Sequence, residues 1–369
     1  MRMLSVNDRR GAEDLVLGAT VLGTGGGGDP EEGLRLLDEV LRDGREIKIV
    51  KLNELPEDSV IVAPYYVGTI APTAETKKSV KIKEPVKVAF EEMERLLGRK
   101  ISAVVATEIG GFNTAIAAYI GAKLGLPVVD GDLLGRAAPE LHQCTVHIFD
   151  TPMYPSVLVT ETGDVVVVKQ YADIDDYESI ARYLSVLAGR FVAVVDTPLM
   201  MDKARDVVID ETLSLCLSLG KAIREARAEG RSPIEEAVKV LGGWKIFEGI
   251  VKKYSWRDEG GFLTGEVVLE GRGRWSSRSF KTWIKNEHIM AWLDGRPVVM
   301  PPDLIMFLAE DGEPVTNTKL REGMKVHVLA SKAPEVWRTD KGLELFGPRH
   351  FGFEYDYVPV EELIRRCGL

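Results

Sequence analysis

The chain has 369 residues, 45% of them hydrophobic and 28% charged, which is typical of a globular protein long enough for two domains. Its net charge of -10 argues against nucleic acid and anionic membranes as partners. No apolar run has the roughly eighteen residues of a membrane-spanning helix, and residues 1–7 do not resemble a signal peptide. The chain has three cysteines, Cys144, Cys216 and Cys367, which are widely spaced. These features predict a cytoplasmic protein with reduced thiols.

The first notable segment is a glycine-rich loop between two predicted helices. A helix capped by Ser5 or Asn7 ends near Leu22, and G-T-G-G-G-G-D-P follows at residues 23–30. Asp29 is a good N-cap and Pro30 suits the first helical position, so the loop leads directly into a second helix. A dinucleotide fingerprint needs a strand before the glycines, and a P-loop needs Lys-Ser/Thr after them. Neither is present.

Consecutive glycines can turn their main-chain N–H groups towards a carbonyl oxygen, a carboxylate or a developing oxyanion. The alternative is a flexible, tightly packed turn, although four glycines in a row cost considerable entropy. The sequence therefore makes five loop residues candidates for substrate binding: Thr24, Gly25, Gly26, Gly27 and Gly28.

Two strands are predicted next, at residues 46–52 and 59–63, followed by a helix at residues 86–97. The second strand ends in P-Y-Y-V-G-T, which reads as a strand end with turn residues. Tyr65, Tyr66 and Thr69 could line a pocket there, or the aromatic side chains could pack between layers.

The central unit is a predicted strand at residues 101–107, a helix at 114–124 and a strand at 126–129. Such crossovers are almost always right-handed with parallel strands, so both carboxyl ends point the same way. Ligands in open α/β sheets bind beyond those ends. One end carries Glu108, Gly110, Gly111 and Asn113, with Asn113 also a candidate helix cap, and the other end carries Asp130 and Asp132. The alternative for the aspartates is a role in shaping a turn.

Arg136 and Glu140 follow at spacings of four, but Pro139 would break a continuous helix there, so two short turns are expected. Arg136 could bind a substrate carboxylate or pair with Glu140. A divalent metal such as zinc could recruit His142, Cys144 and His147 with Asp130, Asp132 or Glu140, although the spacing matches no standard zinc motif. The alternative is that T-V-H-I-F forms a strand with His147 on one face.

The predicted domain boundary lies near residue 172. Residues 1–172 form an α/β domain with a parallel or mixed sheet, including a hairpin of strands at 157–160 and 165–170. Residues 173–369 begin with helices, among them one to about Ala188 and one at 208–228, with a strand at 190–196 between them. From about residue 243 short strands and glycine turns predict a small β barrel or sandwich. Glu287 and His350 lie in strand-end or glycine-rich contexts there, and are candidates to face the first domain.

Several segments together resemble one family. G-T-G-G-G-G-D-P, E-I-G-G-F-N, V-D-G-D-L-L-G-R-A-A-P-E-L, K-N-E-H, P-P-D-L-I and G-P-R-H-F-G-F occur in this order across nearly the whole chain. The chain thereby resembles the S-methyl thiohydantoin desulfurase-like family, once catalogued as DUF917 and associated with hydantoinase and oxoprolinase proteins. Two segments depart from the family pattern: D-G-D-L-L-G-R-A-A-P-E-L stands for an expected D-G-D-G-M-G-R-A-F-P-E-L, and P-Y-Y-V-G-T stands where a G-A-P stretch is expected.

The resemblance implies a hydrolase in which water attacks a (thio)hydantoin-like ring carbon with loss of sulfur. On this hypothesis Asp130 or Asp132 activates the water, with Glu108 as a further catalytic candidate, and the glycine loop stabilises the intermediate. Asn113 hydrogen-bonds the ring amide. Two alternatives stay open: a non-catalytic partner or substrate-binding subunit of a hydantoinase-type protein, and a metal-dependent cyclic amidohydrolase. A homo-oligomer is possible in each case.

Overall fold

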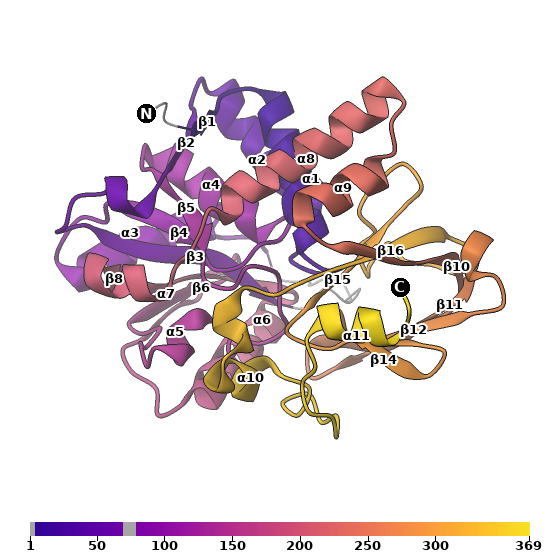
Figure 1. Ribbon diagram of the computed structural model, residues 1–369. Helices are drawn as coiled ribbons and strands as arrows, with labels where there is room; N and C mark the ends of the chain where they lie inside the picture. The colour runs from indigo at the N-terminus through magenta and orange to yellow at the C-terminus, as the bar shows by residue number, and fades with distance from the viewer. Residues whose placement is uncertain (1–3, 69–78) are drawn as a thin grey trace.

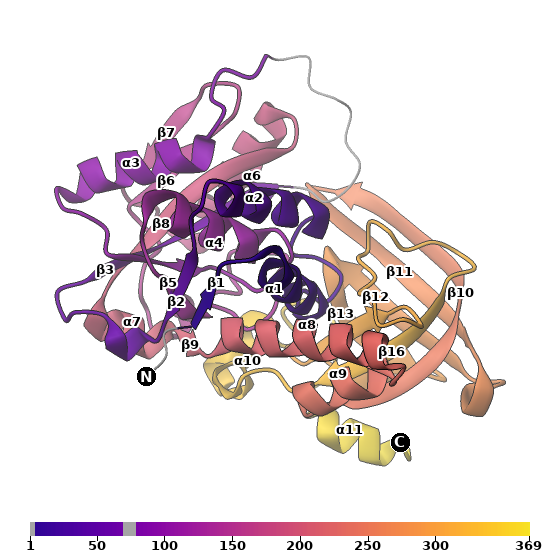
Figure 2. The same ribbon diagram turned by 90° about the horizontal axis from the view of Figure 1, so that it is seen from above.

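The computed structural model describes residues 4–68 and 79–369, so Thr69 lies outside the described residues. Figures 1 and 2 show an α/β layer built around one large sheet, beside a second, curled sheet formed by the C-terminal part of the chain. Within the described ranges, no helix is long and apolar enough to cross a membrane.

The first sheet has nine strands in the order β1-β2-β5-β4-β3-β8-β6-β7, with β9 paired to β5. Strands β2, β5, β4 and β3 are parallel to one another, whereas β1, β8, β6, β7 and β9 add antiparallel pairs, so the sheet is mixed as predicted. The strands are β1 (Leu4–Val6), β2 (Ile47–Val50), β3 (Val60–Gly68), β4 (Ala103–Ala106), β5 (Val128–Asp132), β6 (Ser156–Val159), β7 (Val165–Val168), β8 (Phe191–Met200) and β9 (Ile209–Asp210).

Helices cover both faces of this sheet, because its central strands carry apolar side chains on both sides. One face packs against α1 (Arg9–Leu22), α2 (Pro30–Arg42), α3 (Pro85–Leu97), α4 (Asn113–Leu124) and α8 (Thr212–Glu229). The other face packs against α5 (Thr145–Ile148), α6 (Ile174–Ala188) and α7 (Met201–Val207). A short 3-10 helix, η1 (Leu52–Glu54), follows β2.

Several local predictions are confirmed and others need correction. Asp29 caps α2 with Pro30 in its first turn, and the glycine loop joins helix to helix. The cap of α1, however, is Asp8, because residues 4–6 form β1. The predicted end of the second strand is also wrong, since β3 continues to Gly68 by pairing with β8. The stretch T-V-H-I-F is not a strand, because residues 145–148 form helix α5.

The second sheet has seven antiparallel strands in the order β14-β13-β12-β11-β10-β16-β15. It is a single sheet curled into a half barrel, which matches the predicted small β barrel or sandwich only in part (Figure 2). Its strands are β10 (Trp244–Glu259), β11 (Phe262–Gly271), β12 (Ser279–Lys285), β13 (Glu287–Leu293), β14 (Arg296–Val299), β15 (Leu304–Leu308) and β16 (Lys325–Ser331). The core inside the curl includes Val360 and Ile364 of the last helix, which supplies part of the second layer.

The remaining elements are α9 (Pro233–Leu241), η2 (Gly273–Trp275), η3 (Glu335–Arg338), α10 (Asp340–Phe346) and α11 (Val360–Arg366). Residues of β15 and β16 also belong to the core that lies between the first sheet and its helices, so the two sheets share apolar packing. After residue 172 the chain returns to the first sheet through α6 and β8 before it builds the second. The boundary at residue 172 stays a prediction.

Candidate functional site

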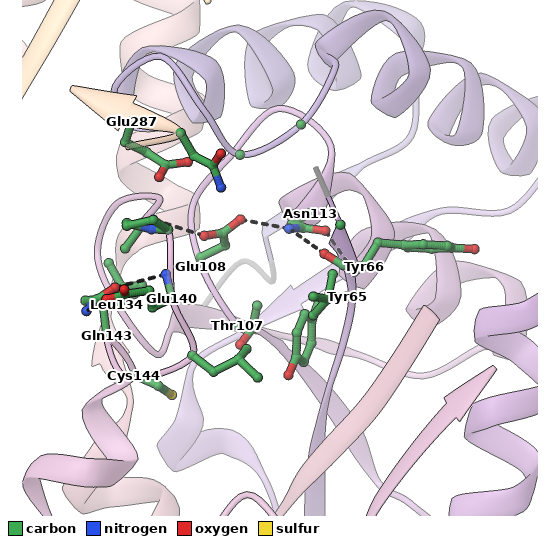
Figure 3. Close-up of a pocket in the computed structure, with 18 of the residues that line it drawn as sticks. Tyr65, Tyr66, Thr107, Glu108, Asn113, Leu134, Glu140, Gln143, Cys144 and Glu287 are labelled. Atoms are coloured by element: carbon green, nitrogen blue, oxygen red, sulfur yellow. Dashed lines mark hydrogen bonds between the residues drawn. The ribbon is translucent and has the colours of Figure 1, made fainter. Parts of the chain in front are cut away.

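A pocket lies where the first sheet meets the second. It is lined by residues at the carboxyl ends of the parallel strands β3 and β4, by the turns after β5, by Gly27 and Gly28 of the glycine loop, and by Asn286 and Glu287 at the start of β13. The predicted location beyond the strand ends is therefore where the pocket lies. Figure 3 shows Glu287, Glu108 and Asn113 at one end of the pocket, and Glu140, Gln143 and Cys144 around another side.

The glycine loop is held in place by main-chain hydrogen bonds from both halves of the molecule. His288 donates its N–H to the carbonyl oxygen of Thr24 at 2.9 Å, and Asn317 donates to that of Gly25 at 2.8 Å. From the first domain, Phe112 donates to the carbonyl oxygen of Gly27 at 3.0 Å. The loop is thus a fixed part of the pocket wall, and its position depends on the contact between the two sheets.

Glu287 lies directly against this loop. A Cβ atom added to Gly26 would stand 1.8 Å from Glu287 Oε1, so only glycine at position 26 leaves room for the carboxyl group. The turn that presents Glu287 is fixed by Asn286, which has a positive φ of 55° and accepts the Leu263 N–H at 2.9 Å through its side chain. Steric fit between loop and turn therefore sets where the Glu287 carboxyl group lies.

The protonation state of Glu287 follows from its surroundings. Its side chain is 3% exposed, and Oε2 has no hydrogen-bond partner among the described residues. Burial raises the pKa of Glu287 well above its usual range, and the nearby Glu108 carboxyl raises it further, whereas Arg136, Arg182 and the N–H of Gly27 act in the opposite direction. The net result is a carboxyl group that holds its proton.

Glu108 is the second buried carboxyl group at this end of the pocket. Its Oε1 accepts a hydrogen bond from Asn113 Nδ2 at 2.7 Å, and its Oε2 accepts one from the N–H of Ala138 at 3.2 Å. Burial raises the pKa of Glu108 to about 7, with the two hydrogen bonds and the more distant arginines limiting the shift. The charge of the Glu108 carboxylate disfavours ionisation of Glu287, so the two carboxyl groups have different proton affinities.

Asn113 positions Glu108 instead of capping the helix. It is the first residue of α4, whose preceding residue, Phe112, makes no side-chain cap. Its Oδ1 accepts the N–H of Tyr66 at 3.0 Å, while its Nδ2 bonds to Glu108. Both polar atoms of the side chain are thus engaged in tying Glu108 to strand β3.

Glu140 forms an ionic network on another side of the pocket. It accepts hydrogen bonds from His350 Nε2 at 2.7 Å and Gln143 Nε2 at 3.0 Å, and pairs with the ammonium group of Lys285. Burial alone would raise the pKa of Glu140, but these partners hold it well below its usual range. As expected from the sequence, His350 faces the first domain, and it does so by contacting Glu140.

The two aspartates of the D-G-D segment do not line the pocket. Asp130 accepts a hydrogen bond from the main-chain N–H of Ser214 at 2.8 Å and another from the Ser214 hydroxyl. These bonds hold the start of α8 against β5. Asp132 Oδ2 accepts the N–H groups of Leu134 at 3.0 Å and Gly135 at 2.7 Å, which shapes the turn after β5. Burial raises the pKa of Asp132 to about 7. The turn-shaping alternative describes Asp132, and neither aspartate is placed to activate a water in the pocket.

Arg136 is also not a substrate ligand in this structure. Its side chain is fully buried, and its five N–H groups donate to the carbonyl oxygens of Ala137, Pro302, Asp303 and His288 and to Thr24 Oγ1, at 2.8–3.0 Å. Among the described residues, Arg136 forms no ion pair with Glu140 or with any other carboxylate side chain. Arg136 instead fastens the glycine loop to the second sheet.

Gly110 and Gly111 have packing roles. A Cβ atom on Gly110 would lie 2.4 Å from Gly27 Cα, and one on Gly111 would lie 2.6 Å from Thr20 Oγ1. The side chains of these two positions must be absent for the E-I-G-G segment to contact the glycine loop. The two glycine motifs therefore meet through main-chain contact.

The metal-ligand candidates point to separate partners. His142 Nε2 contacts Asp175 Oδ1 at 2.9 Å, and His147 Nε2 contacts the carbonyl oxygen of Leu141 at 3.1 Å. Burial lowers the pKa of His147 to about 4. Across residues 4–68 and 79–369, no three His, Cys, Asp or Glu side chains gather in an arrangement that could hold a metal ion. The four candidates Asp130, Asp132, His142 and His147 therefore do not fit a shared metal site.

Several lining residues had no sequence signal of their own, among them Phe112, Gln143, Arg182 and Phe191. Arg182 donates to the carbonyl oxygens of Gly68 and Pro139, both at 2.7 Å, and so joins β3 to the segment before Glu140. Tyr65 and Tyr66, which the strand-end pattern did suggest, line the pocket. Arg182 lies in helix α6, Phe112 directly before α4, Gln143 in the turn before α5, and Phe191 at the start of β8. At these places nothing in the local sequence distinguishes a lining residue from a packing one.

The fold and the site thus define a two-domain α/β protein with a buried pair of carboxyl groups in a pocket between a mixed sheet and a curled antiparallel sheet. The model of the "S-Me-THD-like, N-terminal domain" matches residues 10–170, and that of the "S-Me-THD-like, C-terminal domain" matches residues 172–360. The chain belongs to the S-Me-THD-like family, which confirms the resemblance predicted from the motifs.

Comparison with solved structures gives a protein from Chromobacterium violaceum, determined by X-ray crystallography. It is 24% identical to this chain, and the alignment has a TM-score of 0.78 and covers 97% of this chain and 100% of the other. At this identity the likeness shows a shared fold. Comparison with curated proteins gives no match.

Proposed function

We propose that this protein hydrolyses a thiohydantoin-like ring, with water replacing sulfur at the ring carbon. The observation that carries the proposal is the pair of buried carboxyl groups with different proton affinities, Glu108 and Glu287, at one end of the pocket. A group that ionises near neutral pH suits a general base, and one that stays protonated suits a general acid. Membership of the S-Me-THD-like family supports this reaction class.

The size of the pocket suits a small ring. Its cavity measures about 80 Å³. One water needs about 10–15 Å³ by the same measure, so the cavity holds about five to eight waters. A five-membered ring with two exocyclic atoms has a similar number of heavy atoms, which leaves little room for a large substituent in the same space.

A protonated carboxyl group is complementary to one edge of such a ring. It offers one O–H donor and one carbonyl acceptor side by side. A ring amide or thioamide is held cis, and therefore presents its N–H and its oxygen or sulfur on the same side. In our proposal Glu287 Oε2, the unpartnered oxygen, carries the proton and donates to the sulfur, while Oε1 accepts the ring N–H.

Glu108 then removes a proton from the attacking water. The water oxygen bonds to the ring carbon, and Glu287 delivers its proton to the sulfur as the C–S bond breaks. The ring carbon becomes a carbonyl carbon. Glu108 then gives up the proton that it took from water, and Glu287 regains a proton, so both carboxyl groups return to their starting states. From a thioxo ring both water protons leave with the sulfur as hydrogen sulfide; from an S-methyl ring one leaves with methanethiol and the other stays on a ring nitrogen. The N–H of Gly28 is the main-chain donor that we assign to the developing negative charge.

The test is sulfur release from 2-thiohydantoin and its S-methyl derivative by the purified protein, measured with a thiol reagent beside the Glu108→Gln and Glu287→Gln variants. We expect wild-type turnover and a loss of about 10²–10⁴-fold in each variant. Ring opening without sulfur release would favour a cyclic amidohydrolase, and a loss of rate on chelation would favour metal dependence. No turnover of either ring would favour a binding subunit of a larger enzyme.

A further inference from the structure

The inner pocket shares a wall with a much larger groove. The groove measures about 1010 Å³ and runs past the glycine loop and the starts of α3 and α4. Four residues line both hollows: Gly28, Tyr66, Phe112 and Phe191. Whatever extends from a ligand in the inner pocket into the groove must therefore pass these residues.

Three of the four form an aromatic wall, which we define as Tyr66, Phe112 and Phe191. The ring centroids of Tyr66 and Phe112 are 5.5 Å apart, and Phe191 lies 6.4 Å from each of them. Each ring thus contacts the other two at distances typical of aromatic pairs. The wall is partly exposed, because all three residues are only half-buried.

Two glycines make room for this wall. A Cβ atom on Gly28 would lie 2.4 Å from Phe112 Cβ, and one on Gly68 would lie 2.3 Å from Phe191 Cδ1. Each ring therefore lies against a position where no other residue type fits. The absence of side chains at positions 28 and 68 therefore allows Phe112 and Phe191 to lie between the pocket and the groove.

We propose that the aromatic wall binds an apolar substituent on the ring carbon of the substrate, so that the ring occupies the inner pocket and its aromatic or aliphatic side chain lies in the groove. This inference rests on the proposed function. The first argument is size: the inner cavity holds little more than the ring, so a substituent must extend into the groove. The second is polarity: beyond the aromatic wall the groove is lined by the apolar side chains of Val86 and Ile116. The outer groove carries charges of both signs, including Glu32, Arg35 and Arg190, and so does not select a charged substituent.

The experiment compares binding of hydantoin and 5-benzylhydantoin by calorimetry, using oxygen analogues that contain no sulfur to release. We expect wild type to bind the benzyl compound about 10–100-fold more tightly, as burial of one aromatic group predicts. Phe191→Ala and Phe112→Ala should each reduce this preference at least about fivefold, and Phe191→Leu should have an intermediate effect in case the alanine variant does not fold. Tyr183→Ala, at a side chain 69% exposed on α6, is the control and should not change the preference.

An unchanged preference in the wall variants, no preference in wild type, or no binding of either ring would overturn the inference. Its failure and that of the proposed function are distinguishable. Sulfur release from thiohydantoin with no preference for the benzyl compound would support the proposed hydrolase and refute the substituent-binding role of the aromatic wall. A preference for the benzyl compound that depends on Phe191, without any sulfur release, would support a ring-binding site and refute the proposed hydrolase.

Discussion

The pH dependence of stability gives a quantitative test of the environment of Glu108. The pKa of Glu108 is about 7 in the folded protein, against an ordinary value of 4.5, so the folded protein keeps a proton that the unfolded chain releases between these values. The contribution of this group to stability is therefore complete below pH 4.5 and is lost as the pH rises towards 7. At about 1.4 kcal/mol for each pH unit, the loss amounts to about 3 kcal/mol.

Glu108→Gln does not titrate and so removes this loss. At low pH the variant should be less stable than wild type by about 1 kcal/mol, because its NH2 group replaces one of the two oxygens that face the donors of Asn113 and Ala138 and cannot accept a hydrogen bond. As the pH rises from 4.5 to 7.5, the difference in unfolding free energy, variant minus wild type, should increase by about 3 kcal/mol. The variant would then be the more stable protein at neutral pH, and its hydrolytic rate should be lower by about 10²–10⁴-fold.

The assay is urea denaturation of both proteins at several pH values across this range. The matched control is Glu354→Gln, the same substitution at an exposed glutamate, which should not reproduce the increase of about 3 kcal/mol. Parallel stability curves for wild type and Glu108→Gln would show that the Glu108 carboxyl group has an ordinary pKa, and would remove the physical basis for its role as a base.

Three further substitutions test separate parts of the site. Asn113→Ala removes the 2.7 Å donor to Glu108, so the pKa on the acid side of the pH–rate profile should rise; an unshifted profile would contradict the positioning role. Arg136→Met leaves five buried acceptors unpaired and should lower the unfolding free energy by about 3–5 kcal/mol, whereas a loss below about 1 kcal/mol in urea titration would refute its fastening role. Gly26→Ala places a Cβ 1.8 Å from a carboxyl oxygen and should reduce kcat about 10²-fold or more, while Gly44→Ala, with nothing within 4 Å, should not; equal rates in both variants would contradict the proposed fit.

Local signals in the sequence predicted much of the first domain. The cap and proline at Asp29 and Pro30 placed α2, and the apolar runs before Glu108 and Asp130 placed β4 and β5. The glycine loop lines the pocket beyond the strand ends through Gly27 and Gly28, although the D-G-D segment, expected in the same cleft, does not. The predictions that succeeded are those that short-range periodicity, caps and the handedness of crossovers determine.

The catalytic assignment could not be predicted in the same way. The D-G-D segment resembled a strand end, but β9 pairs with β5 at Gly131 and Asp132 and extends the strand through both aspartates. Glu287 and Glu108 line the same pocket only because the second sheet packs against the first, and no local pattern encodes that arrangement. The same limit applies to the curled sheet, since alternation along a strand shows which side chains are buried but not whether the sheet closes.

The most direct test of the central claim is the infrared difference spectrum of the carboxyl groups between pH 5 and 9, recorded for wild type, Glu108→Gln and Glu287→Gln. We predict that one protonated carboxyl signal of wild type at neutral pH is missing in Glu287→Gln, and that one of the signals lost near pH 7 is missing in Glu108→Gln. Asp132 also titrates near pH 7, so its signal should remain in both variants. A wild-type spectrum in which both groups are already ionised at pH 6 would contradict the account.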